Sequence, residues 1–521
     1  MLITRPSPDT HHLGSKEDSG GNAVRPPTGS GSIESVLGKT DSIHGSNGAL
    51  AATGLDNQSQ NGGTRAWLAV FGCWLALFAS LGFMNVLSTF QAYLTATETV
   101  HLSSGTIGGV IFGYASLSFL VGIYVGPLFD KYGPKWLILG GTVSLVASLL
   151  LASAGTATVL ALIALALLGS LGSTLLYLPS IAVIAHVFST RRGLATGLAT
   201  TSTSASGVVF PFLLRALFAS VGWTWAVRII SVFCLVLTGA ANFLITRAPT
   251  TSKKTVEEEE KEEKGNKKKH GASPSIVSSD TITTTATSNS GGSRNSRSNR
   301  SGSNRISSSS SHPHIFAIFR STPGFTSTLL ATFCAQLASF LALSYMSRYA
   351  FFQEKSGRTT GASEVVAIAN GASAAGRVLV GWAADRTGPF NASVGCCAAA
   401  ALVALAVWLP AAETVTTWGA TVTFAVLFGL ASGGAASLVP VAVGRLCDTR
   451  QFGRCYGTCH AIASFLVVLA IPVAEQAAGR GSNRGNYLGL AVATGVLYAA
   501  AAAAFAAARV TVVGRRIWIA F

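Results

Sequence analysis

Arg377 stands in an apolar stretch that is otherwise suited to a membrane-spanning helix. It lies eight residues before Asp385, so it sits about 12 Å along the helix from that charged end. A guanidinium near the bilayer centre costs about 2.5–3.5 kcal/mol, so we expect Arg377 to face a wet cavity and a partner. Guanidinium groups bind carboxylates through paired hydrogen bonds, and no Asp or Glu lies deep in the predicted helices. A bound carboxylate is one expected partner, and backbone carbonyls are the alternative.

Further polar side chains are spaced to share a central cavity with Arg377. Asn370 and Ser373 precede it by seven and four residues and therefore lie on its helix face. The predicted substrate-binding set comprises Arg377, Asn370, Ser373, Asn85, Tyr177 and Gln336. Each of the uncharged residues alone also fits an interhelical hydrogen bond. His460 titrates near neutral pH and is the candidate proton site, with a position at the cytoplasmic mouth of its helix as the alternative.

Two turns repeat the pattern G-x-x-x-D-[KR]-x-G-P, 255 residues apart. The first glycine allows close packing, the acid can accept hydrogen bonds from the N-terminus of a neighbouring helix, and the later glycine permits a tight turn. We interpret both turns as latches that stabilise one conformation and break in another. The predicted latch residues are Gly126, Asp130, Lys131 and Gly133 in one copy, and Gly381, Asp385, Arg386 and Gly388 in the other.

A second set of residues repeats at nearly the same distance. The offsets are 260 or 261 residues, and the set pairs Gly172, Pro179, Gly193 and Gly197 with Gly433, Pro440, Gly453 and Gly457. Two independent sets at similar offsets indicate an internal duplication into two parallel repeats.

The composition is that of a membrane protein, with 49% hydrophobic and 11% charged residues, against about 25% charged residues in soluble domains. Twelve apolar stretches are long enough to cross a bilayer. They cover about 66–94, 106–129, 136–155, 158–185, 194–219, 223–246, 324–347, 362–384, 391–411, 416–441, 456–475 and 487–508. We predict an all-α polytopic membrane protein with twelve transmembrane helices in two pseudo-symmetric six-helix bundles.

Lys and Arg are enriched in the loops on the side of both termini, which predicts cytoplasmic termini. We expect the plasma membrane, with a vacuolar or other internal membrane as the alternative. The predicted domains are a disordered tail (1–65), an N-terminal bundle (66–246), a disordered cytoplasmic linker (247–315), a C-terminal bundle (316–508) and a short cytoplasmic tail (509–521). The linker is too polar to bury a core.

Several other classes of function are disfavoured. The net charge of +16 is spread over loops and the linker, so we expect contact with the lipid bilayer and not with nucleic acid. The cysteines lie in or beside apolar stretches and show no paired spacing in the predicted outer loops, which predicts small buried thiols. Cys455, Cys459 and His460 lack a fourth ligand, so no metal or other cofactor is expected. No enzyme constellation and no ATP-binding loop is present.

The chain resembles the major facilitator superfamily, and more narrowly its fungal, monocarboxylate-porter-like branch. The matching stretches are RAWLAVFGCWLALFASLGFMNVLSTFQAYL (65–94), LPSIAVIAHVFSTRRGLATGLA (178–199), GWTWAVRI (222–229) and NGASAAGRVLVGWAADRTG (370–388). The resemblance covers both predicted bundles and leaves out the tail and the linker.

This resemblance implies a secondary active or facilitative transporter of a small organic anion, a monocarboxylate, working by alternating access. It also implies proton coupling, yet Ser373 stands where animal relatives carry an acid one turn before the arginine. A transporter of a vitamin-like or neutral solute, and a nutrient sensor that does not transport, are the alternatives.

Overall fold

A computed structural model describes residues 63–96, 104–154, 159–246, 322–354, 362–410, 418–477 and 485–514. The predicted linker, and all but the inner edges of the two predicted tails, lie outside these residues. Within them the chain is helical, and no β-strand occurs in the described ranges.

The described ranges contain twelve helices, and each corresponds to one of the twelve predicted apolar stretches. The N-terminal helices are α2 (Thr64–Ala96), α3 (Ser104–Tyr132), α4 (Pro134–Ala154), α5 (Val159–Val187) and α6 (Arg192–Thr246). The C-terminal helices are α9 (Phe325–Glu354), α10 (Ala362–Thr387), α11 (Pro389–Val403) with the π-turn η1 (Ala404–Trp408), α13 (Trp418–Leu446), the short turn η2 (Thr449–Gln451), α14 (Phe452–Ala477) and α15 (Gly485–Val513). Gly222, at φ 71°, divides α6 into two helices and makes the N-terminal count six.

The outer surface of the helices is apolar, as a bilayer requires. Nine of the described helical stretches are long and apolar enough to cross a membrane. Their outward faces keep large hydrophobic side chains in the open: Leu160 is 75% exposed and Leu402 is 67% exposed. Helices that are hydrophobic all round are typical of membrane spans.

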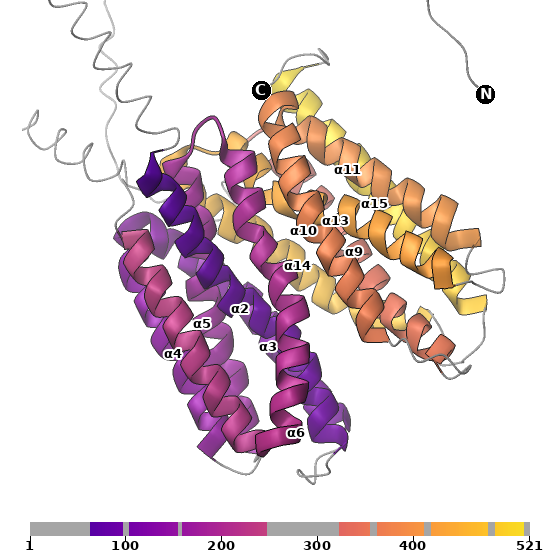
Figure 1. Cartoon of the computed structure of the whole chain (residues 1–521). Helices are drawn as coiled ribbons and strands as arrows, with labels where there is room; N and C mark the ends of the chain where they lie inside the picture. Colours follow the sequence, from indigo (N-terminus) through magenta and orange to yellow (C-terminus); the bar gives the residue numbers. More distant parts are fainter. Residues whose placement is uncertain are drawn as a thin grey trace, which may run out of the picture. The chain divides into compact units, whose positions relative to one another are not determined.

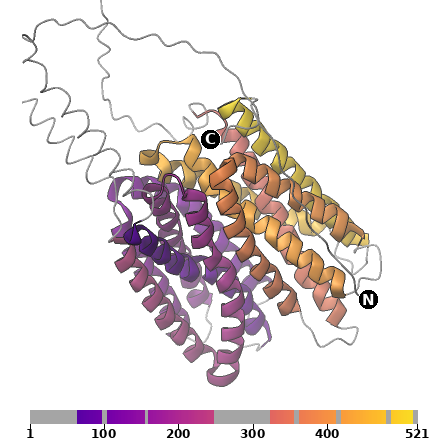
Figure 2. The ribbon, with the colours of Figure 1, turned by 45° about the horizontal axis from the view of Figure 1, so that its top comes forward.

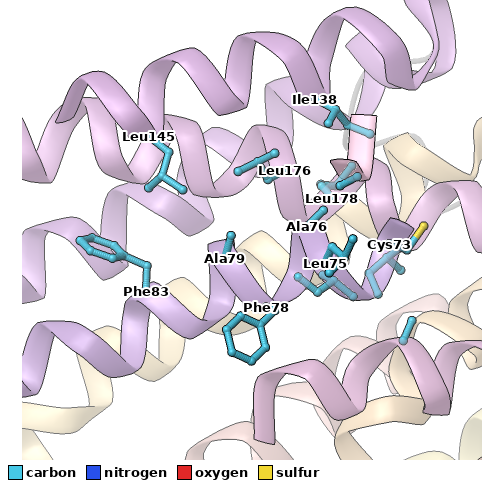
Figure 3. Close-up of a cluster of buried hydrophobic side chains, with 14 of the residues drawn as sticks. Cys73, Leu75, Ala76, Phe78, Ala79, Phe83, Ile138, Leu145, Leu176 and Leu178 are labelled. Atoms are coloured by element: carbon cyan, nitrogen blue, oxygen red, sulfur yellow. The ribbon is translucent and has the colours of Figure 1, made fainter. Parts of the chain in front are cut away.

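Helices α2 to α6 group together, and helices α9 to α15 form a second group (Figure 1, Figure 2). The N-terminal core is built where α2 packs against α5 and α6 and where α4 packs against α5, with Phe83, Leu145 and Leu176 fully buried (Figure 3). The C-terminal core has its own cluster around Phe428 and Tyr498. Each half therefore buries its own apolar interior.

The two halves meet along two seams, which join α3 to α14 and α6 to α10. Glycines line both seams, and a Cβ on Gly126 would collide with the backbone of Gly453. The second seam repeats the arrangement with Gly381 and Gly193. Several of the glycines that revealed the sequence repeat are thus the ones that let the backbones of the two halves touch: Gly126, Gly193, Gly197, Gly381, Gly453 and Gly457.

An acid closes each seam at the same end of the bundle, the end that carries the two repeated turns and is called the motif end below. The Asp130 carboxylate accepts hydrogen bonds from the backbone N–H groups of Gly453 and Arg454, both at 2.9 Å. The Asp385 carboxylate accepts from Gly193 at 2.6 Å and Leu194 at 2.8 Å. These donors lie in the first turns of α14 and α6, where N–H groups lack helical partners and the helix dipole attracts an anion. The acid geometry expected from the sequence is present twice.

The remaining motif residues shape the turns and their surfaces. Gly133 and Gly388 have φ values of 74° and 90°, a left-handed conformation in which glycine avoids a steric penalty. Lys131 and Arg386 lie over neighbouring aromatic rings, and the Arg386 guanidinium is 3.9 Å from the centroid of Trp382. The turns therefore hold each acid at a defined position at the motif end.

Replacing either acid should loosen only its own seam. An Asp130→Asn amide can accept one hydrogen bond, but its NH2 group then faces a backbone donor. Hydrogen bonds to charged groups contribute about 1.5–3 kcal/mol, so amide exchange at 452–458 should accelerate about tenfold or more. Asp385→Asn should do the same at 192–198.

Hydrogen–deuterium exchange of the full-length protein in detergent or lipid measures both segments at once. Each variant is the control for the other, because Asp130→Asn should leave 192–198 unchanged. Equal effects of one variant on both segments would mean that the seams are not held separately by the two acids.

Candidate functional site

A small cavity lies between the halves, enclosed by α2, α3, α5 and α14. Its volume is about 20 Å³, which is room for roughly one water molecule. The N-terminal half contributes Phe119, Gly122 and Tyr177 to the lining, and the C-terminal half contributes Gly457 and His460. Because both halves line it, the cavity changes shape whenever they move against each other.

Aromatic rings surround His460. Its ring centroid lies 5.5 Å from Phe119, 5.2 Å from Tyr177 and 5.5 Å from Tyr456, with the Tyr456 ring stacked at 20°. The hydroxyl groups of Tyr177 and Tyr456 form a hydrogen bond between the two halves. The site therefore offers flat apolar surfaces next to a few polar atoms, as small-molecule sites do.

Two hydrogen-bonded polar side chains, Gln336 on α9 and Ser464 on α14, hold His460 in place. The Gln336 side-chain amide lies 3.2 Å from Nδ1 of His460, and Ser464 donates to Oε1 of Gln336 at 3.0 Å. An amide nitrogen only donates, so Nδ1 accepts and a neutral His460 carries its proton on Nε2. The Gln336 contact thus selects one tautomer of the imidazole.

Arg377 crosses the seam between α10 and α6. Its Nη1 donates to the backbone carbonyl of Thr200 at 3.0 Å, and its Nε donates to the Ser373 hydroxyl at 3.4 Å. A guanidinium has five N–H donors, and these bonds to described residues use two of them. Arg377 also interacts electrostatically with Tyr177, which lines the cavity. The carbonyl partner considered from the sequence is therefore present, and the bonds to the described part of the chain leave other N–H donors of Arg377 for a ligand.

The position of Arg377 in the C-terminal repeat is occupied by a glycine in the N-terminal repeat. Gly122 is the equivalent of Arg377, and Ser118 is the equivalent of Ser373, each 255 residues earlier. Gly122 lines the cavity, whereas its equivalent in the C-terminal half, Arg377, carries a guanidinium. The two halves are alike at the seams and unlike at the centre.

The structure brings most of the predicted binding residues into two neighbouring groups. Ser373 and Arg377 form one group, and Tyr177, Gln336 and His460 form the other. Asn370 is half-buried on α10, seven residues before Arg377. The Asn85 side chain lies outside the described residues.

Sequence reasoning missed the aromatic residues Phe119 and Tyr456. Phe452, Tyr456 and His460 follow each other at four-residue spacing on α14, and their rings stack in order. This spacing places side chains on one helix face, and it was the available signal for the aromatic wall.

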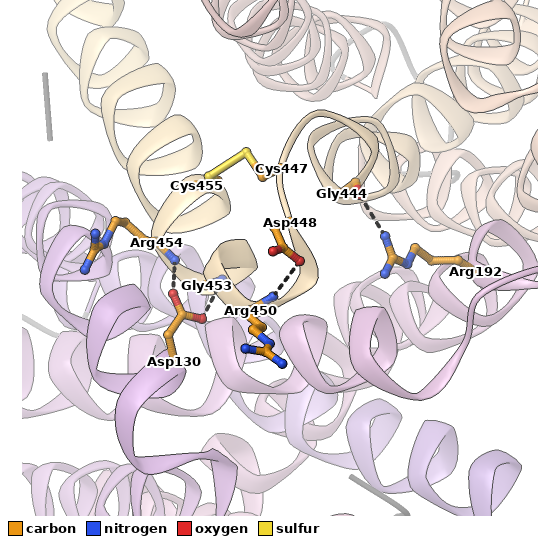
Figure 4. The surroundings of a disulfide bond; sticks show 9 residues. All are labelled: Asp130, Arg192, Gly444, Cys447, Asp448, Arg450, Gly453, Arg454 and Cys455. Atoms are coloured by element: carbon orange, nitrogen blue, oxygen red, sulfur yellow. Dashed lines mark hydrogen bonds between the residues drawn. A yellow bond between two sulfur atoms is a disulfide. The ribbon is translucent and has the colours of Figure 1, made fainter. Parts of the chain in front are cut away.

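The expectation that all cysteines are unpaired is wrong. Cys447 and Cys455 form a disulfide that joins the end of α13 to the first turn of α14 (Figure 4). The turn at η2 folds the chain back and brings the two residues to a Cα–Cα distance of 6.6 Å. In the described part of the chain, no three His, Cys, Asp or Glu side chains gather as a metal site would require.

Comparison with known proteins agrees with this architecture. The Major Facilitator Superfamily sequence model matches residues 73–470. The MFS transporter asaE of Aspergillus flavus is 28% identical over 444 residues, covering 84% of this chain and 84% of the relative. The Fujikurins efflux protein of Gibberella fujikuroi is 28% identical over 396 residues, covering 75% of this chain and 72% of the relative.

Solved structures share the fold at low sequence identity. The fucose:proton symporter FucP of E. coli aligns with a TM-score of 0.57 at 14% identity, over 85% of this chain and 98% of the symporter. The human organic anion transporter MFSD10 aligns with a TM-score of 0.53 at 14% identity, over 85% of this chain and 98% of that protein. The repeated turns, the paired seams and the family match together identify this chain as a member of the major facilitator superfamily.

Proposed function

We propose that the protein transports a small organic anion, a monocarboxylate, by alternating access. The observation that carries this proposal is Arg377, a guanidinium between the halves with N–H donors beyond those that bind Thr200 and Ser373. A carboxylate there would gain charge-assisted hydrogen bonds that a neutral molecule cannot form. The acid contacts at Asp130 and Asp385 would close the motif end during one half of the cycle.

The cavity lined by Tyr177, with which Arg377 interacts, suits the uncharged part of such a substrate. Phe119, Tyr177 and His460 present ring surfaces, and Gly122 and Gly457 leave the backbone accessible between them. Planar, ring-bearing carboxylates fit these surfaces better than short aliphatic acids, because ring stacking adds to the apolar burial. The present cavity is small, so such a molecule would enter when the opposite end is open.

The name of one relative favours a second candidate, the export of a fungal metabolite. The Gibberella fujikuroi protein is an efflux protein for fujikurins, and the ring-lined cavity here would also accept an apolar metabolite. For either substrate we propose a location in the plasma membrane with the motif end and both termini in the cytoplasm. A nutrient sensor with this fold would bind the anion without moving it.

Removing the Arg377 guanidinium should strongly reduce carboxylate transport. Losing its charge-assisted hydrogen bonds should lower the rate about tenfold or more in Arg377→Ala, and Arg377→Lys should recover only part of it, because lysine lacks the planar pair of donors. Uptake into vesicles that contain the purified full-length protein, measured for labelled monocarboxylates and their amides, tests this.

Arg228 supplies the matched control, because it is also a half-buried arginine in a spanning helix. It bonds Ser153 and lies 5.1 Å from the Trp225 ring, away from the cavity. Arg228→Ala should retain carboxylate transport. Equal transport of acids and amides, with Arg377→Ala unaffected, would reject the anion and favour an uncharged metabolite.

We propose His460 as the proton-carrying residue, since it lies in the cavity wall and its ring is oriented by Gln336. His460→Gln should remove the stimulation of uptake by an inward proton gradient. Exchange of labelled for unlabelled substrate should persist, because exchange moves no net proton. A variant that keeps its gradient response would show that the proton travels elsewhere or that transport is not proton-coupled.

A further inference from the structure

Arg192, the first residue of α6, makes contacts that the two acid latches do not include. Its Nη1 donates to the backbone carbonyl of Gly444 at 3.1 Å, and its Nη2 donates to the carbonyl of Ala185 (Figure 4 shows the Gly444 bond). Ala185 lies in the last turn of α5, and Gly444 in the last turn of α13. One guanidinium therefore caps a helix C-terminus in each half.

These two helices are equivalents in the internal repeat. The ends of α5 and α13, Val187 and Leu446, lie 259 residues apart, close to the repeat offset. Their last-turn carbonyls are short of helical donors and carry the negative end of the helix dipole. A cation between these helices attracts both C-terminal ends. If the helices separate, it can stay bound to the carbonyl of only one of them.

Arg192 faces the ring of Phe452, the residue that occupies the equivalent position in the other repeat. Position 452 follows position 192 by 260 residues, the offset that relates Gly193 to Gly453. The Arg192 guanidinium lies 5.9 Å from the centroid of the Phe452 ring. Two equivalent positions can contact each other only near the symmetry axis. Arg192 and Phe452 therefore meet at the pseudo-two-fold axis, between the seams closed by Asp130 and Asp385.

There is a physical reason why the two equivalent positions on the axis carry different residues, Arg192 and Phe452. Arginine in both copies would bring two cations together on the axis, whereas a ring offers its negative face to the single cation. Phe452 also begins the ring stack on α14: it packs on Tyr456 at 5.6 Å, and Tyr456 packs on His460 at 5.5 Å. The axial contact is thus continuous with the cavity wall.

We propose that Arg192 and Phe452 form an axial clamp that holds the motif end closed, and that Arg192 acts as a positioning residue for alternating access. The role rests on the motion proposed above and requires no particular substrate. Opening the motif end would pull α5 away from α13 and leave Arg192 with one of its two carbonyls. The rings of Tyr456 and His460 would shift at the same time.

Thiol labelling at Val443 tests the clamp without any substrate. Val443 is 0% exposed on α13, and it packs into the core of the N-terminal half. A Val443→Cys residue should therefore react with maleimide only when the halves part. In the full-length protein in native membranes, Arg192→Gln should raise its labelling rate about tenfold or more, read at this residue by peptide mass spectrometry. Lys135→Gln, which removes an exposed cation of equal charge at the start of α4, should leave the rate unchanged.

An exchange of the two residues separates the clamp from a general loss of folding. Phe452→Arg alone should open the motif end by placing two arginines on the axis. The double variant Arg192→Phe with Phe452→Arg restores one cation and one ring, and the repeat supplies equivalent carbonyls at Arg445 and Ile184. Its labelling rate should return toward that of the parent.

Labelling of the double variant as fast as that of the single variants, or unchanged labelling in Arg192→Gln, would overturn the proposal. These outcomes are independent of the anion proposal, because a transporter of any other substrate would give the same labelling pattern.

Discussion

Close approach of backbone to backbone is the constraint on which the rest of this structure depends. At both seams a glycine of one half touches a glycine of the other: Gly126 meets Gly453, and Gly381 meets Gly193. Only at that separation can the Asp130 and Asp385 carboxylates reach N–H groups at a helix start in the opposite half. Any side chain in place of these glycines would push the halves apart and withdraw the acids from their donors.

The seams also explain why the centre can differ between the halves. Because the glycines and acids already position α3 against α14 and α6 against α10, the residues deeper in the seam need not be alike. Arg377 fills one side and Gly122 leaves room on the other. A duplicated scaffold therefore surrounds an asymmetric centre, with a cation at this position in one repeat and a glycine at the equivalent position in the other.

Much of the fold follows from the sequence, because it depends on local signals. The apolar stretches gave the twelve helices to within a few residues, and the turn glycines have the positive φ that the motif requires. The acids at the helix starts were also predictable, since a repeated acid beside repeated glycines has few other uses. The anion-binding role of Arg377 stays a prediction.

Pairings through space, both within one half and between the halves, could not be predicted from the sequence. Nothing in the spacing of Cys447 and Cys455 shows that η2 would bring them together, and nothing pairs Tyr177 with Tyr456, 279 residues away. The contact of Arg192 with Phe452 depends on where the symmetry axis passes, which is known only once the two repeats are superimposed in space. The contacts between the halves are set by the docking of whole bundles, and no local pattern encodes them.

The glycine seams divide the molecule into atoms that are free to vary and atoms that are not. The contacts that join the halves at the seams are made by main-chain atoms and two carboxylates. The cavity wall, in contrast, is made by side chains such as Phe119, Tyr177 and His460. If the cavity binds the substrate as proposed, substitutions in the wall side chains would change which molecules it accepts and leave the contacts that join the halves as they are. A fold built in this way would be able to accept different molecules without a change in the contacts that join its two halves.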